Sequence, residues 1–255
     1  DRSVSRGLGD VYKRQSEASM TLRYAPGESF VNSKQRRVPV SLDAPVFTLT
    51  HAMGFKGVLG GEYNFNRTEA SIWKRFWLPA SWGKIDCSVK AGAEWNTVPF
   101  PLLILPEANL SYITQRETFC LINNMEFLND RFASMSISYD MNGKLFNRIP
   151  LLKNLKWREM FRVRALWGTL TDKNNPFKSS NPDLFRFPTR DGKFTSFVMD
   201  PKVPYVEASV GIYNIFKLLH VEYVHRFTYR DNPGINKNGI RFMVCLLYTS
   251  PSPRD

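Results

Sequence analysis

The stretch Lys84–Trp95, KIDCSVKAGAEW, decides between fold classes because its polarity changes with every residue. Val89 and Ala91 belong to the apolar set of alternate positions, whereas Lys90 and Glu94 belong to the polar set. A period of two is typical of a β-strand with one apolar and one charged face. In a soluble sheet the apolar face covers a protein core, but in a membrane barrel it contacts lipid while the charged face lines the lumen. The alternation of this one strand leaves both possibilities open.

The same period recurs along most of the chain and predicts an all-β fold with about nine strands. In 203–216, for example, Val206 and Val210 alternate with Glu207 and Ser209. No run of about 18 apolar residues interrupts the pattern, so no transmembrane helix is expected. The predicted strands cover residues 17–25, 45–53, 62–77, 84–96, 132–142, 157–171, 203–216, 219–230 and 238–244.

The connections between these strands mostly alternate between short and long. Outer-membrane barrels have short periplasmic turns and long external loops, and long structureless loops are uncommon in compact soluble domains. The lengths therefore favour the C-terminal part of an antiparallel transmembrane β-barrel. The connection 26–44 is the misfit, since it is long and falls on the periplasmic side. The turns assigned to that side are 78–83, 143–156 and 217–218, and the loops assigned to the outside are 97–131, 172–202 and 231–237.

On this interpretation Cys87, Val89 and Ala91 face lipid, whereas Lys90 and Glu94 face the lumen. The tryptophans agree with the topology, because four of them lie near the predicted periplasmic ends of strands. An outer-membrane barrel carries an aromatic girdle at that level, although aromatic rings at sheet ends also pack against loops in soluble proteins. The four are Trp73, Trp77, Trp82 and Trp157.

Composition and motifs give no sign of catalysis or of a bound cofactor. The chain has 35 Lys and Arg against 23 Asp and Glu, a net charge of +12, but the basic residues are spread over many strands and turns, so nucleic-acid binding is not expected. The three histidines lack the spacing of metal ligands, and the three cysteines include no CxxC pair. We therefore expect a protein that is not an enzyme and has no metal site.

The two ends of the chain are predicted to be non-native tails. Ser5–Gln15 and Cys245–Asp255 can be encoded by opposite strands of one DNA segment, which resembles a transposon-end adapter used in shotgun sequencing. Two ends of a natural protein have no physical reason to share a DNA segment in this way. We therefore expect 1–15 and 245–255 to be adapter-derived tails in a metagenomic sequence, to be left out of fold reasoning.

The remaining residues, 16–244, are then predicted to be a partial outer-membrane β-barrel from a longer protein. Nine strands is an odd number, whereas bacterial single-chain barrels have even numbers. Unpaired strand edges are also costly in lipid. We therefore expect this piece by itself not to form a closed barrel.

Three short segments carry a family resemblance: NRIPLL at 147–152, DNPGI at 231–235 and GIRF at 239–242. With the sequence around them, covering nearly all of 16–244, they resemble the C-terminal barrel of a Bacteroidetes outer-membrane family of unknown function. Members usually carry an N-terminal carboxypeptidase-like regulatory domain, a small β-sandwich without peptidase activity. The barrel is also distantly similar to surface-antigen barrels that insert or translocate outer-membrane proteins.

The resemblance implies a non-enzymatic protein of the outer membrane of a Gram-negative bacterium, with a function in the assembly or translocation of outer-membrane components. Its expected partners are outer-membrane lipid and other outer-membrane or periplasmic proteins. Two alternatives stay open at this point. The chain can belong to a transport barrel or pore for solutes, or to a soluble ligand-binding β-barrel.

The resemblance also implies a candidate site. In protein-inserting barrels a loop that carries an arginine folds back into the lumen and pairs with carboxylates there. The segment MEFLNDRFAS leads from a long loop into a strand, so Arg131, next to Asp130, is the candidate, with Glu94, Glu207 or Glu222 as its partner. The chain has no Arg-Gly-Phe-like triplet there, and the alternative is that Asp130 and Arg131 are solvated loop residues.

Overall fold

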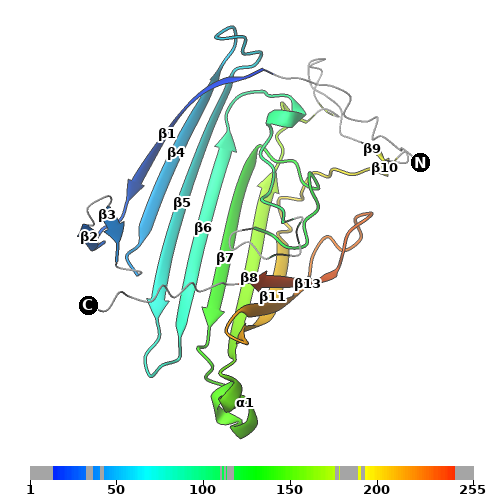
Figure 1. Cartoon of the computed structure of the whole chain (residues 1–255). Coiled ribbons are helices and arrows are strands. Elements are labelled where there is room, and N and C mark those ends of the chain that lie inside the picture. The colour runs from blue at the N-terminus through cyan, green and yellow to red at the C-terminus, as the bar shows by residue number, and fades with distance from the viewer. Residues whose placement is uncertain are drawn as a thin grey trace.

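Nine strands form one antiparallel sheet in the computed structural model of the chain (Figure 1). The structure describes residues 14–32, 37–40, 43–109, 111, 113, 118–175, 178, 189–190 and 193–244. The order in the sheet follows the chain, β1-β4-β5-β6-β7-β8-β11-β12-β13. The strands are β1 (Ser16–Tyr24), β4 (Val46–Phe55), β5 (Phe65–Trp77), β6 (Lys84–Glu94), β7 (Arg131–Asp140), β8 (Arg158–Thr169), β11 (Tyr205–Ile215), β12 (Leu219–Arg226) and β13 (Asn238–Val244).

These nine strands confirm the all-β prediction, and each overlaps one predicted strand with ends that differ by a few residues. Every pairing between them is antiparallel. The sheet is open, because β1 and β13 lie at its two edges and do not pair with each other. The predicted tails are 1–15 and 245–255, and of these residues 1–13 and 245–255 lie outside the described residues, as do 176–177, 179–188 and 191–192 of the long connection after β8.

Several short elements lie in the connections and were not predicted. Two small ribbons pair β2 (Phe30–Asn32) with β3 (Arg37–Pro39), and β9 (Thr189–Arg190) with β10 (Lys193–Phe194). The helical elements are η1 (Phe100–Leu102), η2 (Phe146–Arg148) and α1 (Pro150–Leu155).

The helix α1 has a local sequence cause. Pro150 stands at its start, where a missing N–H is tolerated, and Lys156 ends it with a left-handed φ of 54°. In the part of the chain that is described, no helix is long and apolar enough to cross a membrane.

The connections fall at two ends of the sheet, as predicted, because successive connections of an antiparallel meander must alternate. The turns 78–83, 141–157 and 216–218 lie at one end, which we call the turn end, and the connection 25–45 joins them there. The connections after β4, β6, β8 and β12 lie at the other end, the loop end. Figure 1 shows α1 beyond the turn-end tips of β7 and β8.

The sheet buries charged side chains on one face and exposes apolar side chains on the other, the reverse of the usual arrangement in a soluble protein. On β8 the side chains of Arg162 and Arg164 are buried, whereas Phe161 and Val163 are 40% and 44% exposed. We call the face that carries the buried arginines the inner face and the opposite one the outer face. The outer face also exposes the middle of other strands, for example Val210 of β11.

Strand β6, which contains most of the stretch Lys84–Trp95, divides its residues between the two faces in the same way. Val89 and Ala91 of β6 are exposed on the outer face, and Glu94 is buried on the inner face. Cys87 and Lys90 have intermediate exposure. The predicted division of this strand into two faces is therefore confirmed, while lipid and lumen are assignments that belong to the proposal below.

The apolar core lies between the inner face and the connections that cover it. The two larger buried clusters lie near the ends of β4 and β5 and around Tyr205 of β11, and a smaller one joins Cys120 and Leu121 to Val224 of β12. The two larger clusters both contain residues of the connection between β6 and β7, namely Leu128 in the first and Phe127 in the second, each with no exposed surface. A sheet with a charged inner face thus obtains its apolar packing from a loop rather than from a second sheet.

Candidate functional site

The connection between β6 and β7 packs onto the inner face and forms the centre of the candidate site. We call its residues 97–109, 111, 113 and 118–130 the inner loop. The amide of Phe197 donates to the carbonyl of Glu126 at 2.7 Å, which ties the inner loop to the connection after β8. Ile113 bridges to Phe242 of the edge strand β13. The inner loop is therefore held both by the connection after β8 and by the edge strand β13.

One contact of the inner loop is a buried ion pair between Glu126 and Arg226 of β12. The guanidinium nitrogens donate to the two carboxylate oxygens at 2.6 and 3.0 Å, and both side chains have almost no exposed surface. Arg226 also donates to the carbonyl of Leu121 at 3.2 Å. Its remaining donors reach the carbonyls of Thr228 and Tyr229. A bidentate pair of this kind fixes direction as well as distance.

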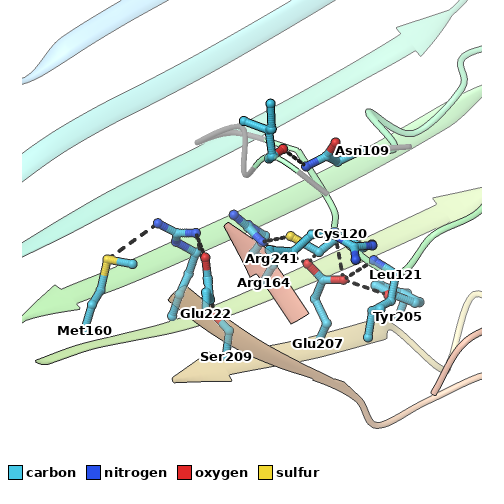
Figure 2. Close-up of polar contacts among 12 residues, drawn as sticks. Asn109, Cys120, Leu121, Met160, Arg164, Tyr205, Glu207, Ser209, Glu222 and Arg241 are labelled. Atoms are coloured by element: carbon cyan, nitrogen blue, oxygen red, sulfur yellow. Dashed lines mark hydrogen bonds and ion pairs between the residues drawn. The ribbon is translucent and has the colours of Figure 1, made fainter. Parts of the chain in front are cut away.

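A second contact is made by the carboxylate of Glu207 of β11, and Figure 2 shows the residues around it. It accepts the backbone amides of Cys120 and Leu121 at 2.9 and 3.1 Å. Arg164 of β8 donates to it at 3.0 Å, and the hydroxyl of Tyr205 donates at 2.9 Å. One buried carboxylate therefore connects two strands to the backbone of the inner loop.

The same turn of the inner loop is held by two further donors. Arg164 donates to the sulfur of Cys120 at 3.3 Å, and Arg241 of β13 donates to the carbonyl of Cys120 (Figure 2). The inner loop thus contacts polar side chains of β8, β11, β12 and β13, four consecutive strands of the sheet.

Glu222 of β12 also lies on the inner face, but its partners among the described residues are side chains of the sheet rather than of the inner loop. Arg162 donates to its two oxygens at 3.0 and 3.1 Å, and the hydroxyl of Ser209 donates to it as well (Figure 2). The His220 ring nitrogen lies 3.7 Å from the carboxylate. This cluster joins β8, β11 and β12 below the inner loop.

At the loop end, two more acids hold the base of the inner loop. Asp130 is fully buried and accepts the backbone amide and the hydroxyl of Thr171 and the side-chain amide of Asn174. Glu94 accepts the amide of Asn66 at 2.9 Å and lies 3.5 Å from the Nε of Arg67. Asp130 therefore accepts donors of the connection after β8, whereas Glu94 accepts the backbone amide of Asn66 in β5 and lies beside Arg67 of the same strand.

The candidate Arg131 does not take the role predicted for it. It is the exposed first residue of β7, and the partners of Glu94, Glu207 and Glu222 are Arg67, Arg164 and Arg162 respectively. The cause is the strand period itself. Asp130 points to the inner face, so the next residue points away from it.

Asp130 is correspondingly not a solvated residue, since it has no exposed surface. The inner loop does fold onto charged strand residues, but with the charges reversed: the loop supplies the acid Glu126 and the strand supplies Arg226. Sequence reasoning missed both. A signal for the inner cluster does exist in the sequence, because the alternation in FRVRALW puts Arg162 and Arg164 on one face of a strand.

A cavity of about 670 Å³ lies beside the inner loop on the same face and extends toward the turn end. Glu107 and Phe119 of the inner loop border it on one side. Much of its wall is polar, and several of its charges are paired, as in Arg75 with Asp86 at 2.6 Å. Serines of β6 and β7 that line it are Ser88, Ser134, Ser136 and Ser138. Among the described residues no group of His, Cys, Asp and Glu could hold a metal ion.

Cys120 offers a direct test of how firmly the inner loop is held. Burial raises the pKa of its thiol, and the guanidinium of Arg164 offsets this only in part. Because the raised pKa leaves little thiolate near neutral pH, we expect Cys120 to react slowly with a maleimide at pH 7 and faster as the pH rises above the usual thiol range. The measurement is the labelling rate in a variant whose other cysteines are serine. Labelling as fast as in the urea-unfolded protein would contradict the closed inner loop.

Fold and site together define a class: an all-β protein whose antiparallel sheet turns its charged face inward, under a loop, and its apolar face outward. The chain belongs to the family of unknown function (DUF5686), C-terminal domain, whose model matches residues 12–177. The match covers more than half of the chain, from β1 through β8 with the whole inner loop. It confirms the expected family of unknown function. None of the curated proteins matches the chain.

Proposed function

We propose that the chain is part of a non-enzymatic β-barrel in the outer membrane of a Gram-negative bacterium of the Bacteroidetes, and that it serves the assembly or translocation of outer-membrane components. The observation that carries this proposal is the inverted sheet. Side chains such as Trp167 and Tyr223 are exposed on the outer face while Arg164 and Glu207 are buried. A contiguous apolar surface of this kind is rare on soluble monomers and suits lipid.

The plugged inner face favours assembly or translocation over an open pore. Solutes that pass along the inner face would have to displace the inner loop, and with it the buried pair of Glu126 and Arg226. A transport barrel is the second candidate, and the polar cavity of about 670 Å³ favours it. A soluble ligand-binding barrel has no comparable support, since its outer face would have to leave residues such as Val163 in water.

Two cysteine variants of the complete gene product test the membrane orientation. Leu59, 94% exposed, lies in the loop-end connection between β4 and β5, and Asn154, also exposed, lies in α1 at the turn end. With a membrane-impermeant maleimide, we expect Leu59→Cys to be labelled on intact cells and Asn154→Cys only after lysis. The unsubstituted protein gives the background. The opposite pattern would reverse the topology, and labelling of neither before lysis would argue against the outer membrane.

Depletion of the complete gene product tests the function. If the protein assembles or translocates outer-membrane components, the folded, heat-modifiable fraction of other barrels should fall while solute uptake changes only later. A purified protein that conducts ions steadily in planar bilayers, combined with normal barrel assembly after depletion, would favour the transport alternative.

A further inference from the structure

The turn end of the sheet exposes large apolar side chains in each of its three turns. Trp82 lies between β5 and β6, Leu151 between β7 and β8, and Phe216 between β11 and β12, with exposed fractions of 38%, 80% and 82%. The connection between β7 and β8 adds Leu145, Ile149 and Leu155 to the exposed set. We call residues 78–83, 142–157 and 214–218 together the turn surface.

The same turn surface is strongly basic. Its longest part, 142–157, contains four basic residues and no acidic one, and Lys217 adds another in the third turn. Three of these cations, Arg148, Lys153 and Lys156, are exposed. Apolar and cationic side chains thus alternate over one surface.

Contacts between the turns make this surface continuous. Lys144 donates to the carbonyl of Ala80 at 2.9 Å, and its ammonium lies 5.1 Å from the ring centre of Trp82. Asn214 donates to the carbonyl of Lys156 at 2.7 Å. The first turn is therefore joined to the second, and the second to the third.

A surface that combines exposed apolar side chains with cations fits the interface of a phospholipid bilayer. Exposed leucine, tryptophan and phenylalanine side chains beside lysines and arginines suit the boundary between phospholipid headgroups and acyl chains. The excess of positive charge selects anionic headgroups over zwitterionic ones. An acidic protein surface would match the charge, but it would not by itself account for a leucine and a phenylalanine that are each at least four-fifths exposed.

We infer that the turn surface is a binding site for anionic phospholipids of the membrane leaflet at that end, with Trp82, Leu151 and Phe216 entering the acyl boundary and Arg148, Lys153 and Lys156 contacting headgroup phosphates. This inference rests on the membrane location proposed above. It adds to that proposal a lipid class and a place on the molecule.

The test uses the detergent-solubilised complete gene product with an equal mixture of phosphatidylglycerol and phosphatidylcholine of identical chains. Mass spectrometry of the intact protein counts the bound molecules of each. We expect a preference of about tenfold for phosphatidylglycerol, since each basic residue near the headgroups adds to the attraction. The variant R148E/K153E/K156E should lose it.

A matched control reverses three exposed lysines at the loop end, K56E/K202E/K237E, and should keep the preference. Retention of a heat-modifiable band shows that each variant is folded. Equal binding of the two lipids by the unsubstituted protein, or an unchanged preference in R148E/K153E/K156E, would overturn the inference and leave an acidic protein as the partner of the turn surface. Failure to bind either lipid would instead count against the membrane location itself.

Discussion

Replacing Arg226 by methionine in the complete gene product should lower the free energy of unfolding by about 3–5 kcal/mol, because it leaves the carboxylate of Glu126 buried without its cation. The side chain of Arg226 has no exposed surface and reaches Glu126 through two hydrogen bonds and Leu121 through a third. The substitution should also release the inner loop. Denaturant titration measures the first effect, and faster maleimide labelling of Cys120 measures the second.

The matched control is Arg230→Met, a change of the same chemistry four residues away at an exposed position. It should leave both measurements nearly unchanged. The double variant R226M/E126L should recover part of the lost stability, since removing both charges of a buried pair costs less than removing one. If R226M behaved like the Arg230 control, the ion pair would not hold the inner loop.

Replacing Val89 by arginine should lower stability by about 2–4 kcal/mol if the outer face contacts lipid at mid-membrane. Val89 is 45% exposed in the middle of β6, and its cross-strand neighbour Ile72 is similarly exposed. In water an exposed arginine there would cost little. The size of the loss, measured by denaturant titration in lipid or detergent micelles, therefore reports on the solvent of the outer face.

The control for Val89→Arg is Ser88→Arg, one residue away on the inner face. Ser88 lines the cavity of about 670 Å³, which has room for a longer side chain and is already polar. Ser209 is a poorer control because it is buried and donates to Glu222. Equal losses at positions 88 and 89 would argue against a single lipid-facing side of the sheet.

The local sequence pattern was sufficient to predict the strands, because a period of two can be recognised within about ten residues. The alternation in β6 and β11 predicted both the strands and the division of their residues between two faces, and the alternating connection lengths predicted the two ends of the sheet. The short elements inside connections, such as α1, escaped prediction because six residues that start at Pro150 carry too little periodicity.

The same reasoning predicted the acids of the candidate site but not their partners. The sequence indicated that Glu94, Glu207 and Glu222 lie on an inward face and therefore need partners, and each is buried with an arginine. It did not indicate which arginine. Arg131 was the choice implied by the family resemblance, and a shift of one position along the strand was enough to point it to the wrong side.

The sequence by itself thus determined the all-β class, the two ends at which the connections lie, and the inward charge of the sheet, because these depend on the period of two and on connection length. Only the tertiary structure decided how the inward charges are neutralised. Glu126 meets Arg226 across 100 positions of the chain, and Glu207 meets Arg164 across 43. Such pairings depend on how the inner loop folds back over the sheet, and no local pattern encodes that path. Each buried charge then needs a partner, because an unpaired charge on the inner face is costly.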